Sequence, residues 1–196
     1  MRLTATSRAI VITVGAVVLA VVVVLGIRIA LGGPVLQAPG ATGVDRFVAA
    51  AEPDTSYVVD GIDVCLDRPG EVRVARVAFE ASSSGAKVVD WGLRSEITKT
   101  GSDPNAPQRL DERPGFDKDL GLTQTCRRGE TAAEMAIEVR KTDEAMARGA
   151  DLVVDYETGW HDRQLVIDLT VTLCGTGQVN DSAVRTCRDI EAEDRQ

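Results

Sequence analysis

Four cysteines are the first side chains in this sequence that could do chemistry. They are Cys65, Cys126, Cys174 and Cys187, and no two of them form a Cys-x-x-Cys pair. An even number of cysteines without metal-ligand spacing is typical of structural disulfides in an oxidising compartment. Of the three pairings that four cysteines allow, we favour Cys174–Cys187 with Cys65–Cys126, because the turn-forming residues 175–181 (GTGQVND) let the chain double back. A four-cysteine zinc site and a redox-active pair remain as alternatives with less support.

The single histidine, His161, limits the catalytic chemistry that the chain can carry. It excludes His-rich metal sites, and any Ser-His-Asp triad would depend on this one residue. The sequence also has no Gly-x-Ser-x-Gly motif and no phosphate-binding glycine loop. His161 lies in residues 158–163 (TGWHDR), between two expected strands, which indicates a hairpin tip. We therefore predict no catalytic residue, and Trp160 and His161 are the candidate partner contacts, with core or loop packing as the alternative for Trp160.

Acidic residues in a long polar segment could in principle supply oxygen ligands to calcium. Residues 117–121 (DKDLG) resemble the start of an EF-hand loop, but the third acidic ligand and the closing glutamate are missing. We therefore predict a solvated acidic loop, no metal ligand and no cofactor, and keep calcium as an alternative. The residues concerned are Asp103, Asp111, Glu112, Asp117 and Asp119.

An uncharged stretch near the start of the sequence predicts a membrane anchor. Residues 9–27 (AIVITVGAVVLAVVVVLGI) carry no charge, would rise about 28 Å as a helix, and are followed by more apolar residues after Arg28. We predict a transmembrane helix over 9–31, with a cleaved signal peptide and a soluble core element as alternatives. Because Arg2 and Arg8 precede the span, residues 1–8 are expected in the cytoplasm and the rest outside, as in a single-pass cell-membrane protein.

The charge of the exterior part bears on its partners. All 30 acidic residues and 19 of the 22 basic ones follow residue 31, so this part has a net charge of −11. Such a field opposes binding to phosphate, which argues against nucleic acid and anionic lipid surfaces as partners. The expected contact with lipid is therefore the span 9–31 itself.

The remaining sequence predicts a linker followed by strands. Residues 32–56 mix Gly, Pro and Ala with little period, so we predict a linker, with a short helical turn around 44–51 as an option. Residues 131–148 are ambiguous, because a capping box at 131–134 suits a helix while alternating apolar residues from Met135 to Val139 suit a strand, which we favour. Period-two patterns predict strands at 57–66, 71–80, 86–95, 152–156 and 165–173, with Trp91 in the core and the last strand central.

Short antiparallel strands with turn signals predict an all-β fold. We expect a single immunoglobulin-like antiparallel β-sandwich over 57–196, with 101–130 as a long polar loop, although the Cys…Trp…Cys spacing of antibody domains is absent. This organisation favours a non-enzymatic interaction module that binds a protein at the outer membrane face through the loop or the 158–163 tip. The alternatives are a small-ligand or calcium-binding ectodomain and, with less support, a hydrolase that uses two carboxylates.

Overall fold

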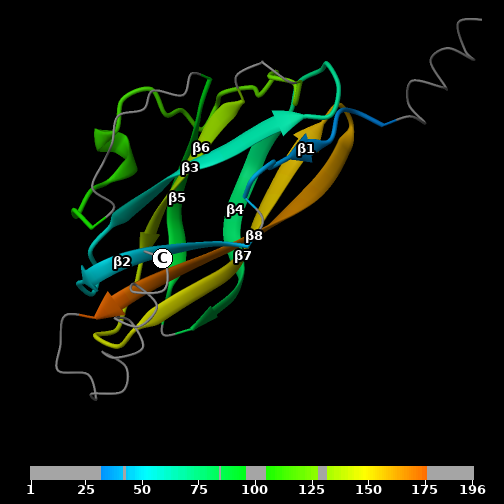
Figure 1. Ribbon diagram of the computed structural model, residues 1–196. Coiled ribbons are helices and arrows are strands. Elements are labelled where there is room, and N and C mark those ends of the chain that lie inside the picture. Colours follow the sequence, from blue (N-terminus) through cyan, green and yellow to red (C-terminus); the bar gives the residue numbers. More distant parts are fainter. Residues whose placement is uncertain (1–31, 42, 84, 96–104, 128–131, 176–196) are drawn as a thin grey trace, which may run out of the picture. The chain divides into compact units, whose positions relative to one another are not determined.

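The computed structural model describes residues 32–41, 43–83, 85–95, 105–127 and 132–175 (Figure 1). These ranges contain eight strands and one short 3-10 helix. The elements are β1 (Leu36–Gln37), β2 (Val44–Ala51), β3 (Tyr57–Leu66), β4 (Arg73–Ser83), β5 (Lys87–Arg94), η1 (Leu110–Glu112), β6 (Ala133–Arg140), β7 (Ala147–Thr158) and β8 (His161–Gly175).

The strands form two four-stranded sheets, with the orders β1-β3-β6-β5 and β2-β8-β7-β4. In β7 and β8 buried and more exposed positions alternate over much of the strand, which lets one face of their sheet bury its side chains. In β8, Leu169 and Leu173 are buried and Asp168 is exposed, and β8 lies between β2 and β7, as the sequence predicted for its last strand. One cluster of buried residues joins the inner faces. The all-β, two-sheet architecture expected from the sequence is therefore confirmed.

The predicted linker over 32–56 is wrong. Leu36 pairs with Leu66 in an antiparallel β1–β3 contact, and β2 pairs in parallel with β8. The apolar side chains of Val48 and Ala51 are fully buried. These strands carry no clear sequence signal, because β1 has only two residues and the β2 register shifts between Val48 and Ala51, which breaks the period of two.

The ambiguous segment 131–148 contains a strand, β6, followed by a loop and the start of β7. Every residue of β6 from Ala133 to Val139 is buried, so both faces of this strand are covered. Residues that alternate apolar and polar are normally half exposed, but here the polar face is also closed off. The helix alternative is therefore wrong, and the capping box at residues 131–134 is a chance match.

The first residue after β6, Lys141, has a fully buried side chain. Its ammonium donates to the carbonyl oxygens of Glu144 at 3.2 Å and Ala145 at 3.1 Å. Burial lowers the pKa of Lys141 below its ordinary value of 10.5, while the charges of Glu144 and Asp143 oppose this shift.

Because of Lys141, the free energy of unfolding should change with pH in the alkaline range. Between its lowered pKa and the ordinary value, the unfolded chain binds more protons than the folded one, so the free energy of unfolding should rise with pH across that window and stay flat below it. Urea denaturation at several pH values checks this. The Lys141→Met variant should lack the rise, and an equal rise in both proteins would contradict the assignment.

The predicted transmembrane helix over 9–31 lies outside the described residues. In the part of the chain that the structure describes, no helix is both long and apolar enough to span a bilayer.

Candidate functional site

A segment of the long polar loop covers the outer face of the β3-β6-β5 sheet. This covering segment, residues 105–127, includes η1, which contacts β5 and β6 on the side of their sheet seen at the left in Figure 1. Leu110 and Phe116 pack there against Val58 and Ala136. A Cβ atom at Gly92 would lie 3.0 Å from the Cβ of Phe116, so a side chain at this position would push Phe116 outward. The segment is therefore packed on the sheet as part of the fold.

Backbone bridges hold the covering segment at three further points. Leu93 pairs with Asp117, Val72 with Leu122, and Leu66 with Thr125. Leu122 is fully buried. These contacts were not foreseen, because the sequence shows only isolated apolar residues in this stretch.

A buried ion pair lies beneath the covering segment. Arg94 donates to the carboxylate of Glu134 at 2.5 Å, and both side chains are less than a tenth exposed. The other oxygen of Glu134 accepts the Gly61 N–H at 3.0 Å. The Arg94 guanidinium also lies 4.5 Å from the ring centre of Phe116, a cation–π distance. The pair therefore links two strands of the sheet to the segment above them.

A second buried carboxylate, Glu138, holds the segment at η1. One of its oxygens accepts the Leu110 N–H at 2.9 Å, and the other lies 3.7 Å from the Arg140 guanidinium. Leu110 N–H is at the start of a helical turn, where a carboxylate satisfies an otherwise unpaired donor. Arg140 in turn donates to the hydroxyl of Ser56 at 2.8 Å.

Two further ion pairs join the segment to the sheet nearer its edge. Arg113 pairs with Asp60 of β3, and its side chain is almost fully buried. Lys118 pairs with Asp90 of β5 and is half exposed. Together with Glu134 and Glu138, these contacts make a polar layer between sheet and segment. Sequence reasoning missed this layer because charged residues are usually interpreted as solvent-facing.

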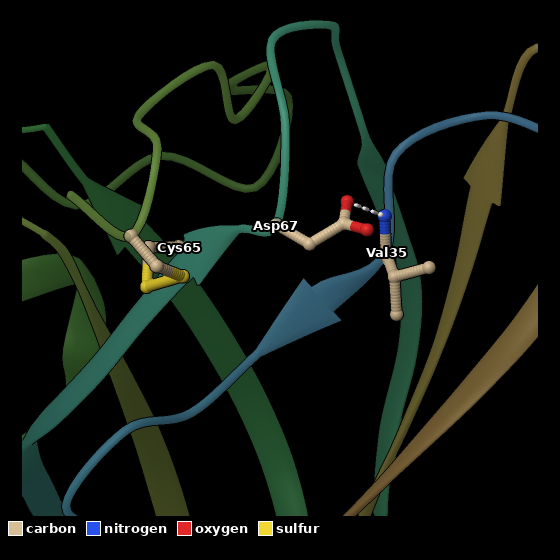
Figure 2. Close-up of a disulfide and its surroundings, with 4 residues drawn as sticks. Val35, Cys65 and Asp67 are labelled. Carbon is tan, nitrogen blue, oxygen red and sulfur yellow. Dashed lines mark hydrogen bonds between the residues drawn. A yellow bond between two sulfur atoms is a disulfide. The ribbon is translucent and has the colours of Figure 1, made fainter.

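A disulfide joins the end of the covering segment to the sheet. Cys65 in β3 is bonded to Cys126, with 5.1 Å between their Cα atoms, as the sequence predicted. Figure 2 shows this bond near Asp67, whose carboxylate accepts the Val35 N–H at 2.7 Å. The second predicted pair, Cys174–Cys187, stays a prediction because Cys187 lies outside the described residues.

The negative charge of the Asp63 carboxylate disfavours the folded state. Asp63 lies directly opposite Glu134 in the β3–β6 ladder. Burial raises the pKa of Asp63 above its ordinary value of 3.8, and the charge of Glu134 raises it further. Between those two pKa values the folded chain binds more protons than the unfolded one, so stability is lost as the pH rises through that window.

Asp63→Asn should therefore raise the melting temperature at neutral pH. The gain should shrink as the pH falls below the raised pKa of Asp63, where the wild-type carboxyl is protonated when folded. Thermal unfolding followed by circular dichroism at several pH values measures this. Asp162→Asn, at an exposed position, is the matched control. A loss of stability at neutral pH would show that the Asp63 charge is instead favourable.

The β7–β8 turn carries the two predicted contact residues. Thr158 pairs with His161, so Gly159 and Trp160 form a two-residue hairpin loop. Gly159 has a φ of 62°, which the first position of such a loop requires. Trp160 is 96% exposed and His161 is also exposed. This hairpin tip, residues 158–161, is confirmed as a tip, while its role in contact stays a prediction.

A shallow depression of about 560 Å³ lies beside the hairpin tip. Five of its seven lining residues have charged or amide side chains, among them Asp155, whose carboxylate accepts a hydrogen bond from Gln164 at 3.0 Å. Small-molecule sites are instead concave and mostly apolar. The depression therefore gives little support to the small-ligand alternative.

The candidate calcium ligands that lie within the described residues do not form a metal-binding cluster. Within the described ranges, no group of three or more His, Cys, Asp or Glu side chains could hold a metal ion. The Asp117 carboxylate accepts the Asp119 N–H at 2.9 Å, while Lys118 between them pairs with Asp90. Asp103 lies outside the described residues. The geometry of 117–121 is thus that of a turn closed by its own side chain.

No protein-family model and no curated protein sequence matches this chain. The covering segment and the hairpin tip are the two candidate functional surfaces of the described residues.

Proposed function

We propose that this protein is a non-enzymatic interaction module, held outside the cell membrane by residues 9–31 as a single-pass anchor with a cytoplasmic N-terminus. A protein partner binds the outward side of the covering segment. The observation that carries this proposal is the buried polar layer, which fixes 23 irregular residues, 105–127, on the sheet.

A gain in stability does not by itself account for the polar layer. Taking two charges out of water costs several kcal/mol per ion, and well-packed apolar residues often serve stability as well or better. What the layer does provide is one fixed backbone path for a segment without regular secondary structure. A binding loop that is ordered before contact loses less entropy on association. This supports a role for the segment in recognition.

The outward side of the covering segment offers charged groups of both signs. The side chains of Arg109, Asp111 and Glu112 are exposed around η1, and Asp117, Lys118 and Asp119 are exposed further along. Such a surface suits a protein partner with complementary charges.

The carboxylate-hydrolase alternative receives no support from the two most buried glutamates. Glu134 and Glu138 are 4% and 5% exposed and lie beneath the covering segment. Their oxygens are engaged by Arg94, Gly61 N–H and Leu110 N–H. A general acid or base needs access to substrate, which these positions lack.

We also propose that the strand layout is immunoglobulin-like. In such domains, strands A, B, E and D form one sheet, and C, F and G the other. The orders β1-β3-β6-β5 and β8-β7-β4 fit this scheme, with β2 as an added strand beside β8. The disulfide departs from the pattern of antibody domains, because it joins β3 to the covering segment and not to the opposite sheet.

Affinity purification of the full-length protein from its native membrane tests the proposal. A Glu112→Arg variant should lose a partner that the wild type retains, because the reversed charge lies on the proposed contact surface. Glu80→Arg, on an exposed position of β4, is the matched control and should retain the partner. Equal loss in both variants, or equal retention, would contradict the assignment of the contact to the covering segment.

A further inference from the structure

We infer that the hairpin tip inserts Trp160 into the headgroup region of the membrane that anchors the chain. This inference rests on the anchor of the proposed function and assigns the tip a role separate from that of the covering segment. The hairpin tip contacts a zwitterionic lipid interface and not the protein partner.

The first described residues enter the sandwich at the same end as the hairpin tip. The Leu36 N–H donates to the hydroxyl of Tyr156, near the end of β7, at 3.3 Å. The Asp67 N–H donates to the Val35 carbonyl at 3.0 Å, just beyond the end of β3. In Figure 1 the arrowheads of β3 and β7 and the blue start of the sandwich lie together at the upper right. Chain entry and tip are therefore neighbours.

The covalent connection is short enough for the tip to reach the membrane surface. An extended chain from Leu36 back to residue 31 covers at most about 17 Å. Strand residues rise about 3.3 Å each, so Trp160 projects roughly 10 Å beyond Tyr156 along the hairpin. The headgroup layer is itself about 5–8 Å thick on each side of the hydrocarbon core. If the span ends near residue 31, Trp160 falls within reach of the interface.

The chemistry of the tip suits this location. Tryptophan is enriched at membrane interfaces, where its ring contacts lipid and its N–H remains hydrated. Trp160 is 96% exposed, although burying a large aromatic side chain is normally favourable. The Gly159–Trp160 loop has two residues, so the indole is presented from a short, paired hairpin.

The net charge near the hairpin tip does not oppose contact with the membrane interface. The loops 67–73 and 157–163 at this end carry four acidic and three basic side chains. The exterior part as a whole is far more acidic, at −11. A nearly neutral end can approach zwitterionic headgroups without the repulsion that the rest of the domain would meet at an anionic surface.

Quenching of tryptophan fluorescence by lipid measures this contact. The full-length protein is reconstituted into phosphatidylcholine vesicles with or without bromine atoms on the acyl chains near the headgroup. The signal of Trp160 is the difference between wild type and Trp160→Phe, since that variant retains only Trp91, which is partly buried against the core. We expect bromine to quench the Trp160 signal strongly and the Trp91 signal weakly. Equal, weak quenching of both would overturn the inference.

Flotation of the vesicles separates this inference from the anchor on which it depends. Wild type and Trp160→Phe should both float with the vesicles, whereas a chain lacking residues 9–31 should not. If the wild type does not float, the proposed anchor is wrong. If the wild type floats but bromine does not quench Trp160, only the inference about the tip is wrong. Shielding of Trp160 in native membranes, but not in these vesicles, would then assign the tip to a protein partner.

Discussion

Replacing Glu134 by glutamine should lower the free energy of unfolding by about 3–5 kcal/mol, the usual result of removing one partner from a buried ion pair. Arg94 would keep its charge at a position that is less than a tenth exposed, with no carboxylate at 2.5 Å to compensate it. The Gly61 N–H would also lose a charged acceptor. Urea denaturation of the wild type and the variant at neutral pH measures the difference.

Two controls separate the buried charge from other effects of the Glu134 substitution. Glu71→Gln removes a carboxylate that pairs with Arg73 at 3.1 Å at an exposed position, so it should change stability by about 1 kcal/mol or less. The double variant Arg94→Met/Glu134→Met removes both charges and should recover part of the lost stability. If Glu134→Gln were as mild as Glu71→Gln, the buried layer would not hold the segment as described.

Removal of the Cys65–Cys126 disulfide should destabilise the protein by about 4 kcal/mol, from the entropy of the loop that it closes. The two cysteines are 61 residues apart in the sequence. The double variant Cys65→Ser/Cys126→Ser avoids leaving a free thiol. Urea denaturation gives the magnitude of the effect.

Loss of the same disulfide should also make the covering segment accessible to trypsin. The segment would keep its ion pairs but lose its covalent attachment next to Thr125, so it should detach before the sandwich unfolds. Cleavage after Arg109 or Lys118, followed by mass spectrometry, reports this directly. Asp90→Asn, which weakens the edge ion pair with Lys118 and keeps every trypsin site, is the control and should remain resistant. Equal resistance in all three proteins would show that the disulfide is not needed to hold the segment.

The strands were predictable because burial on one face imposes a period of two. The strand predicted over residues 57–66 is β3, with the same bounds. The alternation of residues 165–173 predicted a central strand, and β8 lies in the interior of its sheet. The β2 strand was not predictable, since it joins an edge in parallel and its register shifts near Ala51. Trp91 also illustrates the limit, because it is only partly buried although its neighbours suggested a core position.

The candidate site was harder to predict than the strands. The position of Trp160 at a tip follows from local turn chemistry around Gly159. The polar layer depends instead on partners far apart in the sequence, such as Arg94 and Glu134, which are 40 residues apart. No local pattern distinguishes a glutamate that will be buried under a loop from one that faces water. The one long-range contact of the site that was predicted, Cys65–Cys126, could be found because cysteines pair covalently.

Site-specific photo-cross-linking in the native membrane tests the central claim most directly. A photoreactive amino acid is placed at Ala106 or Thr123, both exposed on the covering segment, or at the control positions Glu80 and Val166, exposed on the other sheet. We predict that the first two positions cross-link one and the same membrane or extracytoplasmic protein, and that the controls do not. A partner captured equally from all four positions, or from the control positions alone, would contradict the proposal that the covering segment is the contact surface.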